Sequence, residues 1–161
     1  MNIETLLEFF PLVEPPVTLN EENAEIFRAE NKPIPLSVID NFISNWESEE
    51  DEYTEYIPCF RLPKTDDYFG IIYWKIGLLK YEYILVTSDK DGSLISRKSI
   101  SSVITENQII KKSIAQIDQD FIIHIAAGAH VEGEEYDPSV TQSYSMEILS
   151  SGDILFYDDG V

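Results

Sequence analysis

Three turn signals in the last two-thirds of the chain each separate two apolar, β-branched segments, and few folds accommodate this arrangement. The clearest signal is Asp89-Lys90-Asp91-Gly92, because an Asp-Gly pair between apolar runs is typical of a β-hairpin. The other two turns are expected at residues 118–120 and 150–153. The strands expected around the three turns are residues 81–87, 94–100, 109–117, 121–127, 143–149 and 154–157. Successive hairpins predict an antiparallel β-meander of about six strands.

The first part of the chain, residues 1–46, instead shows the spacing of amphipathic helices. Helices are expected over residues 3–10, from Asn20 onward and over residues 36–46. Prolines separate them, because proline lacks the N–H that continues a helix. We predict a single α+β domain over residues 1–161, with N-terminal helices packed on an antiparallel sheet part, residues 56–161. Phe42 and Trp46 are expected to dock the third helix on the sheet.

Both faces of the expected sheet carry apolar side chains. In the first strand of the meander, Tyr83 and Leu85 point to one face, whereas Ile84 and Val86 point to the other. A sheet with one solvent-exposed face alternates apolar and polar residues more regularly. We expect the helices to cover one face, and the curl of the sheet or a partner to cover part of the other.

The chain is strongly acidic, with 11 Lys and Arg residues against 30 Asp and Glu residues and a formal net charge of −19. Nucleic acids and anionic membrane surfaces repel such a chain, so neither is an expected partner. A basic protein or a cation is compatible with this charge. The acidity is also compatible with the plain interpretation that it maintains solubility.

Cysteine content and the N-terminal residues indicate the cellular compartment. Cys59 is the single cysteine, which excludes an intramolecular disulfide and is typical of a reducing environment. The first residues lack the basic segment of a secretory signal, and the longest weakly polar runs are far shorter than a membrane span. We therefore expect a cytoplasmic protein that does not cross a membrane.

Residues 47–55 contain six acidic residues in nine positions. Carboxylates this close together repel one another and resist burial, so the segment is expected to be an exposed loop. Tyrosines beside carboxylates suit an interface for a basic protein, since tyrosine supplies contact area and carboxylates steer association. The candidate interaction residues are Glu49, Glu50, Asp51, Tyr53, Glu55 and Tyr56.

A second acidic segment is the candidate metal site. Its residues are His130, Glu132, Glu134, Glu135 and Asp137. Carboxylate oxygens suit calcium or magnesium and imidazole suits zinc, but the spacing matches no known zinc site. The alternative interpretation of this segment is an exposed acidic loop.

Catalytic signals are sparse. Cys59 with His124 or His130 would form a thiol–imidazole pair only if folding brought them together. The chain contains no Gly-x-Ser-x-Gly, Walker or His-Glu-x-x-His motif. The segment 89–92 lacks the flanking carboxylates that a calcium loop requires. These observations favour a non-catalytic protein, and no cofactor is expected.

Residues 52–60 (Glu-Tyr-Thr-Glu-Tyr-Ile-Pro-Cys-Phe), with 73–83 and 143–152, resemble a family of small acidic bacterial proteins recorded as uncharacterised. This resemblance extends over nearly the whole chain and implies no activity, cofactor or site. Ile34-Pro35, leading into a helix with Phe42 and then a sheet, is similar to the Smi1/Knr4-type immunity proteins of bacterial toxin systems. Those proteins are acidic α+β domains, so this similarity implies an immunity-type role.

Three functions remain open from the sequence. The first is an acidic protein-interaction module, such as an immunity-type inhibitor that binds a basic protein partner. The second is a small metal-dependent or Cys/His hydrolase that uses residues 130–137. The third is a small-ligand-binding module with an apolar pocket between the helices and the sheet.

Overall fold

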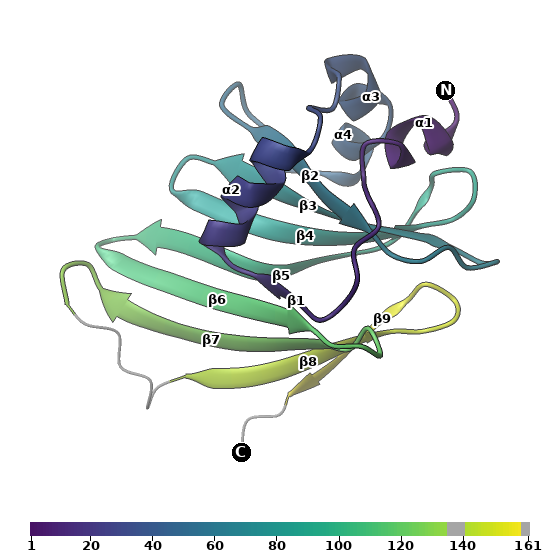
Figure 1. Ribbon diagram of the computed structural model, residues 1–161. Helices are drawn as coiled ribbons and strands as arrows, with labels where there is room; N and C mark the ends of the chain where they lie inside the picture. Colours follow the sequence, from purple (N-terminus) through teal and green to yellow (C-terminus); the bar gives the residue numbers. More distant parts are fainter. Residues whose placement is uncertain (135–140, 159–161) are drawn as a thin grey trace.

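The computed structural model describes residues 1–134 and 141–158. In these residues nine antiparallel strands form one sheet, ordered β2-β3-β4-β5-β6-β7-β8-β9, with β1 paired to β6 (Figure 1). The strands are β1 (Val17–Leu19), β2 (Glu55–Arg61), β3 (Phe69–Gly77), β4 (Lys80–Ser88), β5 (Leu94–Glu106), β6 (Ile109–Ile117), β7 (Ile123–Val131), β8 (Gln142–Ile148) and β9 (Ile154–Asp158). The helices are α1 (Ile3–Leu7), α2 (Glu21–Glu30), α3 (Leu36–Asn41) and α4 (Ile43–Trp46). The predicted α+β class with an antiparallel sheet is confirmed.

The expected count of about six strands is wrong, because β1, β2 and β3 precede the three hairpins. β1 is only three residues long and forms by pairing with β6, with Leu19 opposite Ala115. β2 contains Pro58, which cannot donate a backbone hydrogen bond. The proline is tolerated because β2 lies at the edge of the sheet: β3 is its one neighbouring strand among the described residues, and an isolated bridge to Leu12 involves Arg61 rather than Pro58.

The three predicted hairpins are confirmed, and their turns share one hydrogen-bond pattern. In each turn, the backbone N–H of the fourth residue donates to the carbonyl of the first, as Gly92 does to Asp89 at 3.1 Å. That fourth residue has a positive φ in all three turns, at Gly92 (92°), Phe121 (61°) and Gly152 (91°). The Asp89 carboxylate accepts two further backbone N–H groups of its own turn, which accounts for its position without a bound cation.

The sheet divides between β5 and β6 along the first part of β5, before Ser102. β5 pairs with β4 along most of its length but with β6 only from Ser102 onward, and β1 pairs with the end of β6. Thr87 on β4 donates to the carbonyl of Gly152 in the β8–β9 turn at 2.6 Å. Met146 on β8 shares a core cluster with Leu85 on β4. The sheet therefore curls, and the β6–β9 half contributes side chains to the same core as β2–β5.

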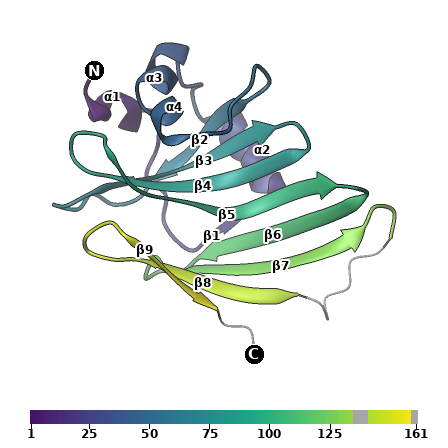
Figure 2. The same ribbon diagram turned by 180° about the vertical axis from the view of Figure 1, so that it is seen from behind.

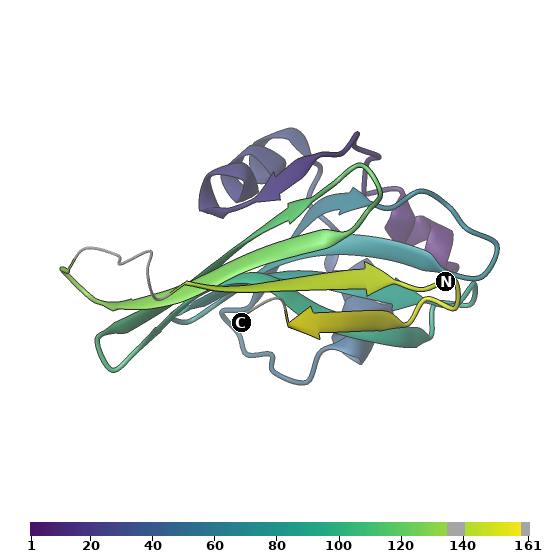
Figure 3. The same cartoon turned by 90° about the horizontal axis from the view of Figure 1, so that it is seen from below.

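Helices cover both faces of the sheet, which corrects the expectation that they cover one. The cluster on one face includes Leu85 and packs against Phe27 of α2, whereas the cluster on the other face includes Val86 and residues of α1, α3 and α4. Figure 3 shows α2 on one side of the sheet and α3 and α4 on the other, and Figure 2 shows α1, α3 and α4 from behind. This arrangement explains why both faces of β4 are apolar.

The predicted third helix exists as two short helices, α3 and α4, with a break at Phe42 (φ −127°, ψ −71°). Phe42 and Trp46 are both buried in the cluster that covers one face of the sheet, as expected. The indole N–H of Trp46 donates to the carbonyl of Gly92 at 3.1 Å, which joins α4 to the β4–β5 turn.

Candidate functional site

Glu47 is buried, which corrects the expectation that the whole segment 47–55 is exposed. Its side chain has 0% exposure, and its carboxylate lies 2.9 Å from Lys75 Nζ on β3. Arg97 on β5 donates to the same carboxylate from Nε and, at 2.7 Å, from Nη2, and the Tyr73 hydroxyl donates to it at 3.1 Å. Two cations and a hydroxyl therefore replace the water that the carboxylate loses.

This ionic cluster fixes the start of the acidic segment to the sheet. Burial alone raises the pKa of the Glu47 carboxyl, but hydrogen bonds and charge from Arg97 and Lys75 outweigh burial and hold the pKa below its usual value. The bond to Glu47 in turn raises the pKa of the Arg97 guanidinium. Glu47 thus stays ionised at neutral pH and anchors the residues that follow α4.

The rest of the segment follows the expectation, but one of the predicted interaction residues, Tyr56 just after it, does not. Residues 49–53 and Glu55 are exposed, but Tyr56 is buried with 7% of its surface accessible. The ring of Tyr56 packs edge-to-face on Tyr73, with centroids 5.6 Å apart. Tyr56 fails as an exposed aromatic contact because it occupies the first inward-facing position of β2, where the second core cluster encloses it.

A groove of about 560 Å³ lies between residues 28–44, which run from the end of α2 into α4, and residues 50–58. The side-chain amide of Asn31 donates to the carbonyls of Pro58 and Cys59, at 2.7 and 3.0 Å, and so ties one wall to β2. On the other wall, Asp51 caps its own turn by accepting the backbone N–H of Tyr53 at 2.8 Å. Both walls are therefore held by side-chain hydrogen bonds.

The groove is acidic around an apolar floor. Its carboxylates are Asp40, Glu50, Asp51, Glu52 and Glu55. Among the described residues, the one cation in the lining is Arg28, which lies 3.5 Å from Glu55 and 3.7 Å from Glu25 in exposed pairs. The floor is formed by Ile34, Ile39, Tyr56, Ile57 and Pro58. Such a lining suits a side chain that combines an apolar stem with a positive charge.

The Tyr56 hydroxyl at this floor is buried and has no hydrogen-bond partner among the described residues. Burial raises the pKa of Tyr56, and the charges of Glu50 and Glu47 raise it further, so the phenol stays protonated. A buried hydroxyl without a partner is rare because losing its hydrogen bonds to water is unfavourable.

The predicted interaction residues separate into two places. Glu50, Asp51, Glu55 and Tyr56 line the groove, whereas Glu49 lies in an adjoining hollow of about 250 Å³. Tyr53 is exposed and lines neither. The sequence analysis missed Asp40 and Glu52 as groove residues. From the sequence, Asp40 could be assigned only to a helix. Its place in the groove could not be predicted, because no local pattern indicates that α3 faces residues 50–58.

The predicted metal residues do not assemble in the part of the chain that the structure describes. No group of three or more His, Cys, Asp or Glu side chains there is arranged to hold a metal ion. His130 lies on β7, and Glu132 and Glu134 follow it. Glu135 and Asp137 lie outside the described residues.

The thiol–imidazole pair is not formed in the structure. Cys59 is fully buried on β2, and burial raises the pKa of its thiol. His124 lies on β7, where its Nε2 is 2.8 Å from an oxygen of Asp118. A buried thiol with a raised pKa is a poor nucleophile, because the thiolate is the reactive form.

Searches against protein-family models, curated proteins and solved structures returned no significant match to this chain. None of the helices in the described residues has the length and apolar character that crossing a membrane requires. The function is therefore argued from the groove and its surroundings.

Proposed function

We propose that this protein is a non-catalytic interaction module that binds a basic protein partner, with an arginine or lysine side chain of the partner in the groove. The observation that supports the proposal is the excess of carboxylates around the apolar groove: the described residues that line it include five carboxylates and one cation, Arg28. Opposite charge on a partner raises the association rate, by about 10- to 1,000-fold at low salt.

The contacts available in the groove favour arginine. Its aliphatic stem matches Ile34 and Ile39, and its planar guanidinium suits the bidentate geometry of carboxylates such as Asp40 and Glu50. In the finer form of the proposal, the chain is an immunity-type inhibitor, and the bound cation belongs to a basic toxin.

The proposal is tested with a capped Gly-Arg-Gly-Arg-Gly peptide and its neutral citrulline counterpart, titrated by calorimetry at low and high salt. The groove variant combines Asp40→Asn, Glu50→Gln and Asp51→Asn. The control combines Asp120→Asn, Glu132→Gln and Glu134→Gln, exposed residues elsewhere, and changes the net charge equally.

We expect the groove variant to weaken arginine-peptide binding by about tenfold or more, or about 1.4 kcal/mol, and the control by no more than about twofold. The citrulline peptide should bind neither protein measurably. Equal losses in both variants would mean that net charge alone attracts the peptide, and the groove proposal would be wrong.

A further inference from the structure

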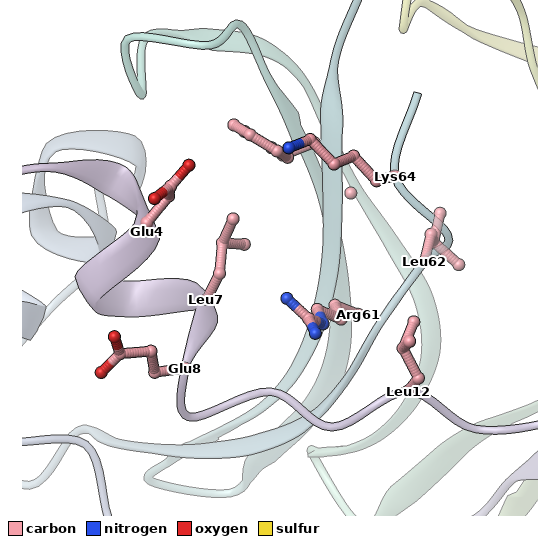
Figure 4. Close-up of a pocket in the computed structure, with 9 residues that line it drawn as sticks. Glu4, Leu7, Glu8, Leu12, Arg61, Leu62 and Lys64 are labelled. Atoms are coloured by element: carbon pink, nitrogen blue, oxygen red, sulfur yellow. The ribbon is translucent and has the colours of Figure 1, made fainter. Parts of the chain in front are cut away.

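Another cavity, of about 360 Å³, has two walls (Figure 4). One wall is formed by residues 4–12, from α1 and the chain just after it, and the other by residues 61–70. Its apolar walls are Leu7, Leu12, Leu62 and Phe69. Leu7 and Leu62 are buried, whereas Leu12 is 58% exposed. The cavity is therefore an apolar recess that is open to solvent at Leu12.

Arg61 extends into this cavity from the end of β2, with its guanidinium directed toward α1 (Figure 4). Its Nε is buried and has no hydrogen-bond partner, and its side chain forms no ion pair with any described residue. This isolation is unusual in a chain with 30 acidic residues. A guanidinium that lines a cavity and has no carboxylate partner among the described residues suits an acceptor supplied from outside.

The backbone around Arg61 holds the side chain in this position. The N–H of Arg61 donates to the carbonyl of Pro11 at 2.9 Å, and the N–H of Leu62 donates to the carbonyl of Gly70 at 2.9 Å. A side chain at position 70 would place its Cβ 2.7 Å from Cδ1 of Leu62, so glycine allows Leu62 to pack as the wall of the cavity. The site is thus built before any ligand binds.

Charge around the cavity restricts the class of ligand. Lys64 also lines the cavity, with its amine 6.0 Å from the centre of the Phe69 ring, and the Lys90 amine sits 3.9 Å from the centre of the same ring. Glu4 and Glu8 are on the opposite wall, from α1 (Figure 4). The cations favour an anion, but the two glutamates oppose a doubly charged group such as phosphate.

We propose that this cavity binds a small monocarboxylate with an apolar body. The carboxylate accepts hydrogen bonds from Arg61, and the apolar body lies against Leu7, Leu12 and Leu62. A free carboxylic acid and a free apolar amino acid both combine one carboxylate with an apolar body, so either would fit this description. The ammonium group of an amino acid would face Glu4 and Glu8.

The proposal is tested by isothermal calorimetry, in which the whole protein is titrated separately with 4-methylpentanoate, L-leucine, 3-methylbutylamine and inorganic phosphate. We expect 4-methylpentanoate or L-leucine to bind, and the tighter of the two identifies the source of the carboxylate. The amine and phosphate should not bind. Binding of phosphate but neither carboxylate, or of none of the four, would overturn the proposal.

Arg61→Gln should weaken carboxylate binding by about tenfold or more, whereas Lys98→Gln, which removes an exposed cation elsewhere, should leave it within about twofold. If Arg61→Gln lowers the thermal midpoint, Leu12→Asn is the second variant, because Leu12 is largely exposed and its change spares the core. Leu12→Asn should weaken binding several-fold. Unchanged affinity in a folded Arg61→Gln protein would contradict the proposal.

Discussion

Replacing Glu47 by Gln removes the carboxylate that pairs with both Lys75 and Arg97 while preserving the shape of the side chain. Both cations are then left partly buried, with side chains that are 9% and 29% exposed. Breaking a buried ion pair from one side costs about 3–5 kcal/mol. In a chain of this size each kcal/mol lowers the thermal midpoint by about 2–4 °C, so we expect a fall of about 6–20 °C.

The control is Glu49→Gln, a neighbouring carboxylate whose side chain is 78% exposed and lies 3.7 Å from Lys80. Exposed pairs of this kind contribute about 0–1 kcal/mol, so the midpoint should change by no more than about 4 °C. Midpoints are measured by calorimetry at neutral pH. A midpoint of Glu47→Gln equal to that of the wild type would refute the view that this cluster anchors the acidic segment.

The remaining predictions concern pH, packing, a turn and proteolysis. The pKa of Glu47 is lowered in the folded state, so its ionised carboxylate stabilises the fold fully above the usual pKa of 4.5 and progressively less as the pH falls. The difference in thermal midpoint between the wild type and Glu47→Gln should therefore narrow in acid. A difference that stays constant with pH would contradict the lowered pKa of Glu47. Phe42→Ala should cost about 3–5 kcal/mol in chemical denaturation, and no loss would show that α3 and α4 are peripheral. Gly92→Ala should destabilise the protein more than Gly133→Ala. Both glycines have a positive φ, but only at Gly92 would an added Cβ meet the Phe42 ring, at 3.0 Å. Equal losses of stability would show that the contact with Phe42 does not matter. A Glu-specific protease should cut first within residues 49–55, and first cleavage inside β4–β9 would contradict this.

The hairpins were predictable because their signals are local. Turn residues such as Asp89 and Gly92 lie between apolar strands, and the hydrogen bonds they make stay within the turn. The apolar residues on both faces of β4 also indicated two covered faces. Which elements cover each face was not predictable, because α2 and α3 are separated only by a short proline-containing connection that gives no sign of crossing the sheet edge.

The candidate site was predictable only in part, for a similar reason. The rule that clustered carboxylates resist burial holds for Glu49 and Glu50, but Glu47 is stabilised by Lys75 and Arg97, which are distant in the sequence. The groove likewise depends on α3 facing residues 50–58, a long-range arrangement. The density of acidic residues therefore predicted the exposure of residues 49–53 and Glu55, but it could not predict that the side chain of Glu47 is buried.

The most direct test of the groove proposal is an NMR titration of the isotope-labelled protein with the capped Gly-Arg-Gly-Arg-Gly peptide. We expect the largest amide shifts at residues 34–40 and 50–58, saturating together with a single affinity and disappearing in the variant that combines Asp40→Asn, Glu50→Gln and Asp51→Asn. Shifts spread evenly over acidic surfaces, or largest near Glu132 and Glu134, would contradict the assignment of the groove as the binding site for a basic partner.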